Sequence, residues 1–331
     1  MILASAPLRM SFVGGGSDLP SYSREHGGAV VSATIDKYVY VAVHATFDGS
    51  LRLGGGFTEV AASTDALKHP LTREVLRLLE VRGGLDIVSM SDVPAQGTGL
   101  GSSSSFTVAL LHAVAAHQGR AVDAATLARW SCHVELERLG EPIGKQDPYA
   151  AAFGGLNFIE FHPDDTVSVH PVACPDATLA TLQSRLLTFY TGITRPAASV
   201  LRGQDAAIQS QRHTREALGR MVALARRMRG DLERGDLDGF AALLDENWRL
   251  KRELRDGVSS PTIDDWYARA RRAGAQGGKL LGAGGGGFLL FYAPEEHHPA
   301  IAAALPELRR VDMRLQPRGS AITPVRRGEG T

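Results

Sequence analysis

One segment of the 331-residue chain constrains its fold more than any other: "GTGLGSSSSFTVALLHAV", residues 97–114. Three glycines and four serines are followed at once by apolar residues at helical spacing, among them Phe106, Leu110 and Val114. A flexible linker would not lead directly into an amphipathic helix. The segment therefore predicts a structured turn that opens a helix.

The glycine turn does not match the two common nucleotide motifs. A P-loop needs a lysine that is absent after Gly101, and the dinucleotide fingerprint needs a third glycine where Ser102 stands. Glycines 97, 99 and 101 do allow close approach of an anion, and the free N–H groups of a helix start attract phosphate. Serine hydroxyls suit Mg²⁺. A serine-capped helix without any ligand remains the alternative.

The composition indicates an ordinary globular protein. Hydrophobic residues make up 44%, charged residues 22%, and the 36 basic residues balance 36 acidic ones. This balance argues against nucleic acid or a membrane surface as a partner. The start "MILASAPLR" is not typical of a signal peptide, and Cys132 and Cys174 suit a reducing compartment. We expect a cytoplasmic protein that is a monomer or a homodimer.

The apolar pattern predicts an α+β fold without regular alternation of strand and helix, and a boundary near Pro175. Residues 29–47 are rich in β-branched and aromatic types and predict two strands. A helix over 65–79 has Asp65 as its expected N-cap, and a helical region over 197–255 is expected to break at Gly230 and Gly235. Other expected strands cover 2–13, 85–91, 154–161, 166–172, 185–192, 288–292 and 309–316; other expected helices cover 123–139 and 262–274.

Two further glycine-rich loops stand near the ends of the chain. In "PLRMSFVGGGSD", Arg9 precedes Asp18 by nine residues, although each alone reads as an ordinary strand or turn residue. The loop "GAGGGG" (282–287) formally matches a dinucleotide motif, but it leads into a strand instead of opening a helix. It predicts close backbone approach to a ligand or to another loop, with Gly284 and Gly285 at its centre.

The segment "HVELERLGEPIGKQDPYAAAF" carries two acids. Glu135 falls late in a predicted helix, and the tight turn "EPIGKQD" delivers Asp147. Taken alone, Asp147 is best interpreted as the cap of the helix that follows.

Taken together, the three glycine loops resemble, in order and over nearly the whole chain, those of the GHMP kinases, which include galactokinase and mevalonate kinase. The stretches "GGGSDLPSYSREHGG", "GEPIGKQDPYAAAFGGLNF" and "FYTGITRPAAS" resemble the D-glycero-α-D-manno-heptose 7-phosphate kinases within that superfamily. The resemblance implies a ribosomal-protein-like α+β domain over 1–175 and a ferredoxin-like domain over 176–331. It places an active site between the two.

The resemblance also implies roles for single residues. Asp147 would be the catalytic base that receives the sugar hydroxyl proton, with Arg9 keeping it ionised, and Asp18 would hold sugar hydroxyls. Ser103 and Glu135 would ligate Mg²⁺. The ATP phosphates would lie on Gly97, Gly99, Leu100, Gly101, Ser102, Ser103 and Ser104. The implied reaction is ATP-dependent phosphorylation of O1 of the heptose 7-phosphate.

One departure from galactokinases bears on the sugar. Those enzymes carry Glu-His where this chain has Gly15 and Gly16. Two glycines would leave the far end of the sugar site open for a longer sugar or a terminal phosphate. Lys145 and Arg195, with Lys279 third, are the cations expected to bind that phosphate, and solvated surface cations remain the alternative.

Four other interpretations are weighed against this one. A fucose or other free-sugar 1-kinase is disfavoured by the opened Gly15–Gly16 turn. An octose 8-phosphate 1-kinase would carry nearly the same motifs. A non-catalytic GHMP-fold binding protein is disfavoured because Arg9, Ser103, Glu135 and Asp147 are all present. A dinucleotide oxidoreductase is disfavoured by the context of both glycine motifs.

Overall fold

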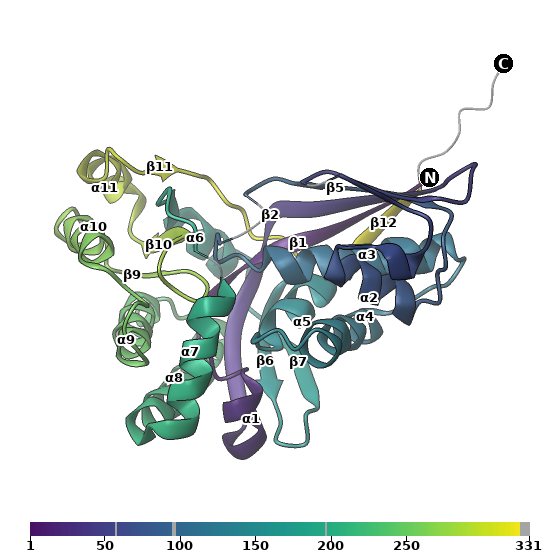
Figure 1. Cartoon of the computed structure of the whole chain (residues 1–331). Coiled ribbons are helices and arrows are strands. Elements are labelled where there is room, and N and C mark those ends of the chain that lie inside the picture. The colour runs from purple at the N-terminus through teal and green to yellow at the C-terminus, as the bar shows by residue number, and fades with distance from the viewer. Residues whose placement is uncertain (57, 95–96, 196, 325–331) are drawn as a thin grey trace.

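A computed structural model describes residues 1–56, 58–94, 97–195 and 197–324 (Figure 1). Ala95 and Gln96 of the central glycine motif and Pro196 lie outside the described residues. The strands are β1 (Ile2–Val13), β2 (Gly28–Ala45), β3 (Leu51–Gly54), β4 (Glu59–Ala61), β5 (Leu85–Ser91), β6 (Leu156–Phe161), β7 (Val167–Pro171), β8 (Leu186–Tyr190), β9 (Gly277–Leu280), β10 (Phe288–Tyr292), β11 (Arg309–Arg310) and β12 (Ala321–Pro324).

The helices fall between these strands in an irregular order, which confirms the α+β prediction. They are α1 (Pro20–His26), α2 (Pro70–Leu78), α3 (Ser102–His117), α4 (Ala124–Cys132), α5 (Gln146–Phe153), α6 (Asp176–Arg185), α7 (Ala197–Ser210), α8 (Arg212–Glu233), α9 (Phe240–Glu253), α10 (Pro261–Arg272) and α11 (His298–Ala304). A π-helical turn, His133–Arg138, extends α4.

The first sheet has eight strands, in the order β12-β1-β2-β5-β3-β4, with β6 paired to β2 and β7 paired to β6. The prediction of two strands over 29–47 is wrong, because β2 is one strand of 18 residues. Residues 29–45 contain no glycine or proline, so no turn-forming residue ends this strand early. Register shifts between Pro7 and Arg9 and between Ser11 and Val13 lie opposite it in β1. Such irregularities bend a ribbon without ending the strand.

The β1–β2 ribbon is buried on both faces over residues 6–13 and 28–35, and on one face over the rest of its length. Ala4 and Ala6 of β1 join the core formed with α2–α5, whereas Leu8, Met10 and Phe12 join the core formed with α8 and α9. Figure 1 shows these helix groups gathered at opposite ends of the molecule. The helix predicted after the glycine turn is present as α3, but its predicted amphipathic character is wrong, because α3 is buried on nearly all sides.

The second sheet is antiparallel, in the order β11-β8-β10-β9. Successive residues of β10 pack into two different hydrophobic cores. Leu290 belongs to the core that includes α8 and α9. Phe291 belongs to a second core, together with Trp266 of α10 and Ile301 of α11. Strands up to residue 171 belong to the first sheet and β8–β11 to the second, whereas β12 returns to pair with β1. We keep the domain boundary near 175 as a proposal.

Several predicted boundaries are wrong. Asp65 lies in a separate 3₁₀ turn, and α2 begins at Pro70 with His69 as its cap, because proline suits the first helical position. Gly230 lies inside α8, although Gly235, with φ +75°, follows its end as predicted. The predicted strand over 309–316 is reduced to β11 and a single bridge between Leu315 and Ile35. Helix α6 and strand β12 were not predicted.

Both cysteines are free thiols. Within the part of the chain that the structure describes, no helix combines the length and the apolar character that crossing a bilayer requires.

Candidate active site

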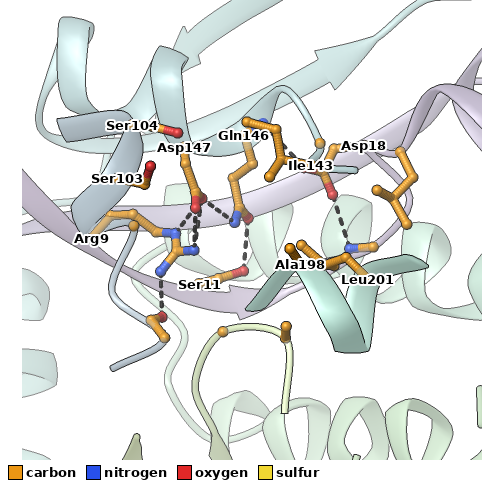
Figure 2. Close-up of a pocket in the computed structure, with 18 of the residues that line it drawn as sticks. Arg9, Ser11, Asp18, Ser103, Ser104, Ile143, Gln146, Asp147, Ala198 and Leu201 are labelled. Carbon is orange, nitrogen blue, oxygen red and sulfur yellow. Dashed lines mark hydrogen bonds and ion pairs between the residues drawn. The ribbon is translucent and has the colours of Figure 1, made fainter. Parts of the chain in front are cut away.

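A cavity of about 320 Å³ lies where the three glycine motifs meet. Figure 2 shows residues from both halves of the chain around it. Its wall includes Arg9, Ser11, Gly15, Gly16, Asp18, Gly97, Thr98, Gly99, Gly101, Ser102, Ser103, Ser104, Glu135, Gln146, Asp147, Ala198, Leu201, Gln204, Lys251, Gly282 and Ala283.

Arg9 and Asp147 form a two-bond ion pair in this cavity. Arg9 Nε donates to Asp147 Oδ1 at 2.7 Å and Nη2 donates to Oδ2 at 2.8 Å (Figure 2). The Arg9 backbone N–H donates to the Leu100 carbonyl at 3.0 Å, which fixes the arginine beside the central glycine loop. Asp147 stands in the first turn of α5, whose N-cap is Lys145. The capping interpretation of Asp147 is therefore wrong, since its carboxylate faces Arg9.

The central glycine loop requires its glycines. Gly97, Gly99 and Gly101 have φ of +72°, +76° and +81°, a region that other residues rarely adopt. A Cβ on Gly99 would overlap the Leu281 carbonyl, and one on Gly282 would overlap Gly99. The late glycine loop thus approaches another loop, which is one of the two alternatives that the sequence left open. The contact holds the two loops together at the cavity.

The four serines at the start of α3 have different surroundings. Ser103 lines the cavity, and Ser102 lines it beside Thr98. Ser104 Oγ donates to Glu135 Oε2 at 3.0 Å, and Ser105 Oγ donates to the Pro7 carbonyl at 2.9 Å. The helix therefore presents its first turn and two hydroxyls to the cavity, where its N–H groups favour an anion.

Glu135 is a buried carboxylate that forms no ion pair with any described residue. It is 1% exposed, it accepts from Ser131 Oγ at 2.7 Å and from Ser104, and burial raises its pKa to about 7. It reaches the cavity close to Ser103. Among the described residues no three His, Cys, Asp or Glu side chains form a metal-binding group.

These surroundings fit Mg²⁺. A divalent ion beside Glu135 would supply the positive charge that this buried carboxylate lacks. Mg²⁺ prefers oxygen and is commonly held by one or two carboxylates together with substrate phosphates. Glu135 and the Ser103 hydroxyl offer oxygen ligands of that type next to the helix start.

Asp18 lies at the opposite side of the cavity, where it accepts from the backbone N–H groups of Gly16 at 3.0 Å and Gln146 at 3.1 Å. Burial first, and the charge of Asp147 second, raise the pKa of Asp18. Gln146 joins the two acids, because its backbone N–H donates to Asp18 and its side-chain Nε2 donates to Asp147 Oδ1 at 3.2 Å. Its Oε1 accepts from Ser11 Oγ. Asp18 and Asp147 thus belong to one hydrogen-bonded network.

The Gly15–Gly16 turn is less open than the sequence suggested. A Cβ on Gly16 would overlap the amide of Gln204, a residue of α7 that is 1% exposed. At Gly15 a Cβ would meet only Ser11 Oγ, at 3.2 Å. Gln204 Nε2 is buried and has no hydrogen-bond partner among the described residues. An amide with an unused donor therefore fills the space beside Gly16 at the wall of the cavity.

The three predicted phosphate cations do not line this cavity. Lys145 lines an adjacent cavity of about 650 Å³, where its Nζ donates to the Asp165 carbonyl and carboxylate at 2.8 Å each. Lys279 is buried and donates to the carbonyls of Ser11 and Phe12. Arg195 is exposed.

The two glycines of the late loop that were predicted to contact substrate also lie outside the lining of this cavity. Gly285 packs beside the Arg195 side chain and Gly284 beside Val258, and neither is among the lining residues. Gly282 and Ala283 of the same loop do line the cavity.

The sequence reasoning missed Lys251, Gln204, Gln146 and Ser11, all of which line the cavity. A signal existed for Lys251. It is one of only five lysines in the chain, and it stands at helical spacing from Trp248 and Leu254, where an apolar residue is expected.

The chain matches two family models, GHMP kinases N terminal domain over residues 65–155 and GHMP kinases C terminal over residues 228–309. It is 30% identical over 295 residues to a D-glycero-alpha-D-manno-heptose 7-phosphate kinase of Campylobacter jejuni, with 86% of each chain covered.

Solved structures agree with the fold. A D-glycero-D-manno-heptose 1-phosphate kinase from Bacteriodes thetaiotaomicron superposes with a TM-score of 0.80 and 26% identity, covering 99% of this chain and 100% of that one. A Lactococcus lactis galactokinase complexed with galactose superposes with a TM-score of 0.79 over 97% of this chain and 95% of that one. Its identity of 15% supports the fold alone. The predicted two-domain fold is confirmed, and the chain belongs to the GHMP kinase family.

Proposed function

We propose that the protein is an ATP-dependent anomeric sugar kinase that converts D-glycero-α-D-manno-heptose 7-phosphate into the 1,7-bisphosphate, a step toward nucleotide-activated heptose. The observation that carries this proposal is the Arg9–Asp147 pair, which lies between the phosphate-binding helix start and Asp18. The 30% identity to a heptose 7-phosphate kinase supports the choice of sugar.

The residues around the pair fit in-line phosphoryl transfer. The sugar O1 would bond to the γ-phosphorus of ATP while the bond from that phosphorus to the β-bridging oxygen breaks, releasing ADP. The O1 proton would pass to the Asp147 carboxylate, which is 27% exposed and faces the cavity. Arg9 holds that carboxylate in place and offers positive charge at the reacting oxygen.

The nucleotide and its metal ion have a separate place in this proposal. The ATP phosphates would lie over Gly97–Ser104 at the N-terminus of α3. Ser103 and Glu135 would hold Mg²⁺, which neutralises phosphate charge when it is bound. The role of the chain is to present these oxygens on a buried, fixed framework.

The sugar would lie between Asp18 and α7. Asp18 accepts hydrogen bonds and Gln204 Nε2 can donate one, so the two side chains match the two sides of a sugar hydroxyl. Ala198 and Leu201 on the same helix line the cavity and would contact the ring (Figure 2).

A second candidate keeps the reaction and changes the sugar phosphate. The two heptose kinases similar to this chain carry names that place the existing phosphate at different carbons, C7 in one and C1 in the other. A 1-phosphate has no free O1, so another hydroxyl would have to face Asp147.

An octose 8-phosphate would present the same anomeric hydroxyl on a longer chain.

A substrate panel separates these candidates. The purified protein is given Mg-ATP with heptose 7-phosphate, heptose 1-phosphate, an octose 8-phosphate, galactose or fucose, and ADP release is measured. Fastest turnover with heptose 7-phosphate supports the proposal. Preference for the 1-phosphate or for a free sugar would overturn it, and ADP release with none of them would favour a non-catalytic binding protein.

We also propose that the enzyme acts in the cytoplasm. Its two free thiols suit a reducing compartment, and its balanced charge does not favour nucleic acid or a membrane as partner.

A further inference from the structure

A lysine on α9 contacts the active site beside two of the glycine motifs. Lys251 follows Asn247 by four residues, so both side chains project from one face of the helix. Asn247 Oδ1 accepts from the Gly14 N–H at 3.0 Å, and Lys251 Nζ donates to the Gly282 carbonyl. One helix face therefore fixes the first and the third glycine loops where they border the cavity.

The Lys251 ammonium is buried and forms no ion pair within the described residues. The residue is 5% exposed and lines the cavity. Within the described part of the chain, Lys37 and Lys145 pair with carboxylates, whereas no carboxylate lies within ion-pair distance of Lys251. An ammonium has three N–H donors, and a buried one without an anion is costly. An anionic ligand would complete this site.

The neighbours of Lys251 indicate where that anion lies. Gly282, which accepts from Lys251, touches Gly99 of the central loop, and the Gly99 carbonyl accepts from Arg9 Nη1 at 2.6 Å. Two cations thus hold the two touching loops beside the helix start. Asp147 forms an ion pair with Arg9, whereas Lys251 has no ion-pair partner among the described residues.

We propose that Lys251 is a catalytic residue whose ammonium binds a non-bridging oxygen of the phosphoryl group during its transfer from the nucleotide to the sugar. In the loose transition state of phosphoryl transfer, negative charge is spread over these oxygens. A fixed cation in a cavity with little water stabilises that charge strongly. The inference rests on phosphoryl transfer at this cavity, as in the proposed function, and is independent of which sugar is used.

Burial makes this charge sensitive to pH. Burial first, and the charge of Arg9 second, lower the pKa of Lys251 to about 8, while Asp18 and Asp147 oppose the shift. The ammonium of Lys279 is the other cation in electrostatic contact with it. The charged form therefore predominates below pH 8 and is lost as the pH rises through that value.

Three variants test the role. Lys251→Met keeps the length and removes the charge, Lys251→Arg keeps the charge, and Lys68→Met removes an exposed lysine far from any site residue in the sequence. With the best sugar phosphate, we expect kcat of Lys251→Met to fall about 100-fold or more, with KM for both substrates changed only a few-fold. Lys251→Arg should recover at least a tenth of the activity, and Lys68→Met should match the wild type.

Two further measurements separate catalysis from a structural bridge to Gly282. Without ligands, Lys251→Met should unfold at the same or a higher temperature than the wild type, because it removes a buried charge that has no ion-pair partner. The wild-type kcat/KM should fall as the pH rises through about 8, and this limb should move to higher pH in Lys251→Arg, because arginine stays protonated.

Binding of a transition-state mimic makes the test independent of sugar identity. Calorimetry with Mg-ADP and aluminium fluoride should show tight binding to the wild type and weak binding to Lys251→Met, while Mg-ADP alone binds both equally. Failure of the wild type to turn over any sugar phosphate would count against the proposed function alone. Near-normal kcat in Lys251→Met, an unfolded Lys251→Met protein or an unmoved pH limb in Lys251→Arg would overturn the role of Lys251.

Discussion

Arg9 and Asp147 are 138 residues apart in the sequence and meet through two hydrogen bonds of 2.7 and 2.8 Å. The exposure of the two side chains differs, since Arg9 is 6% exposed and Asp147 is 27% exposed. The arginine is thus enclosed by protein, while the carboxylate keeps a face open to the cavity. A group that receives a proton from a substrate hydroxyl needs this combination of fixed position and access.

Replacement of Asp147 by Asn tests that arrangement. Asp147→Asn keeps the size of the side chain and removes the proton acceptor, so kcat should fall by about 100- to 10,000-fold. Binding of Mg-ATP and sugar should change only a few-fold, because Asp18 and the α3 loop are intact. The kcat values of the variant and the wild type are compared by steady-state kinetics. The temperature is one at which circular dichroism shows that the variant is folded. Turnover within tenfold of the wild type would rule out the role of Asp147 as base.

The contact between Gly99 and the late glycine loop leads to a second prediction. Gly99→Ala places a Cβ against the Leu281 carbonyl at a φ of +76°, and Gly119→Ala meets nothing at a nearly equal φ of +75°. Both substitutions impose the same backbone strain, about 1–2 kcal/mol, because the two φ values are nearly equal. Gly99→Ala should therefore lose clearly more unfolding free energy than Gly119→Ala, and it alone should weaken Mg-ATP binding. Equal losses in denaturant titrations would show that the loop contact has no importance.

Ser103 and Ser105 allow a test of the metal site on one helix turn. Ser103→Ala removes a hydroxyl that lines the cavity, whereas Ser105→Ala removes one that donates to the Pro7 carbonyl in the core. We expect the Mg²⁺ concentration for half-maximal rate to rise several-fold in Ser103→Ala only. Ser105→Ala should instead lose about 1 kcal/mol of stability. Unchanged Mg²⁺ dependence in Ser103→Ala would contradict the ligand assignment.

Gln204 should determine how tightly the sugar binds. Its buried Nε2 lacks a partner among the described residues, and a sugar hydroxyl would supply one. Gln204→Ala should raise KM for the sugar phosphate about tenfold, equivalent to a hydrogen bond of roughly 1.4 kcal/mol, and leave KM for ATP unchanged. Gln209→Ala, on the same helix but exposed and paired with Asp205, is the matched control. If Gln204→Ala raised KM for the sugar phosphate and KM for ATP by the same factor, Gln204 would have a structural role instead.

The site could be predicted from the sequence where a conformational requirement left a mark. Glycines at positive φ before a helix are a local feature of this kind. The grouping of Arg9, Asp18, Ser103, Glu135 and Asp147, which the cavity brings together, was expected only from the resemblance to the GHMP kinases. Their assigned roles remain predictions. The long strands β1 and β2 have strong β-forming composition, yet the continuity of β2 was missed because bulges in its partner strand leave no clear sequence signal.

The residues that were missed come from packing between distant elements. Lys251 and Gln204 reach the cavity because α9 and α7 are placed there by the cores that they share with β1 and the second sheet. The cations chosen from the sequence were selected for their closeness to motifs along the chain. Lys145 and Lys279 instead point to Asp165 and to backbone carbonyls of β1, which only the tertiary structure determines.

The position of the new phosphate on the sugar is the decisive test of the proposed reaction. The purified enzyme is incubated with Mg-ATP and D-glycero-α-D-manno-heptose 7-phosphate, and the product is examined by ³¹P and ¹H NMR. We expect a second phosphorus signal coupled to the anomeric proton, and no such product with Asp147→Asn on the same time scale. A new phosphate on any other carbon, or no sugar product while other sugars react, would contradict the proposed reaction.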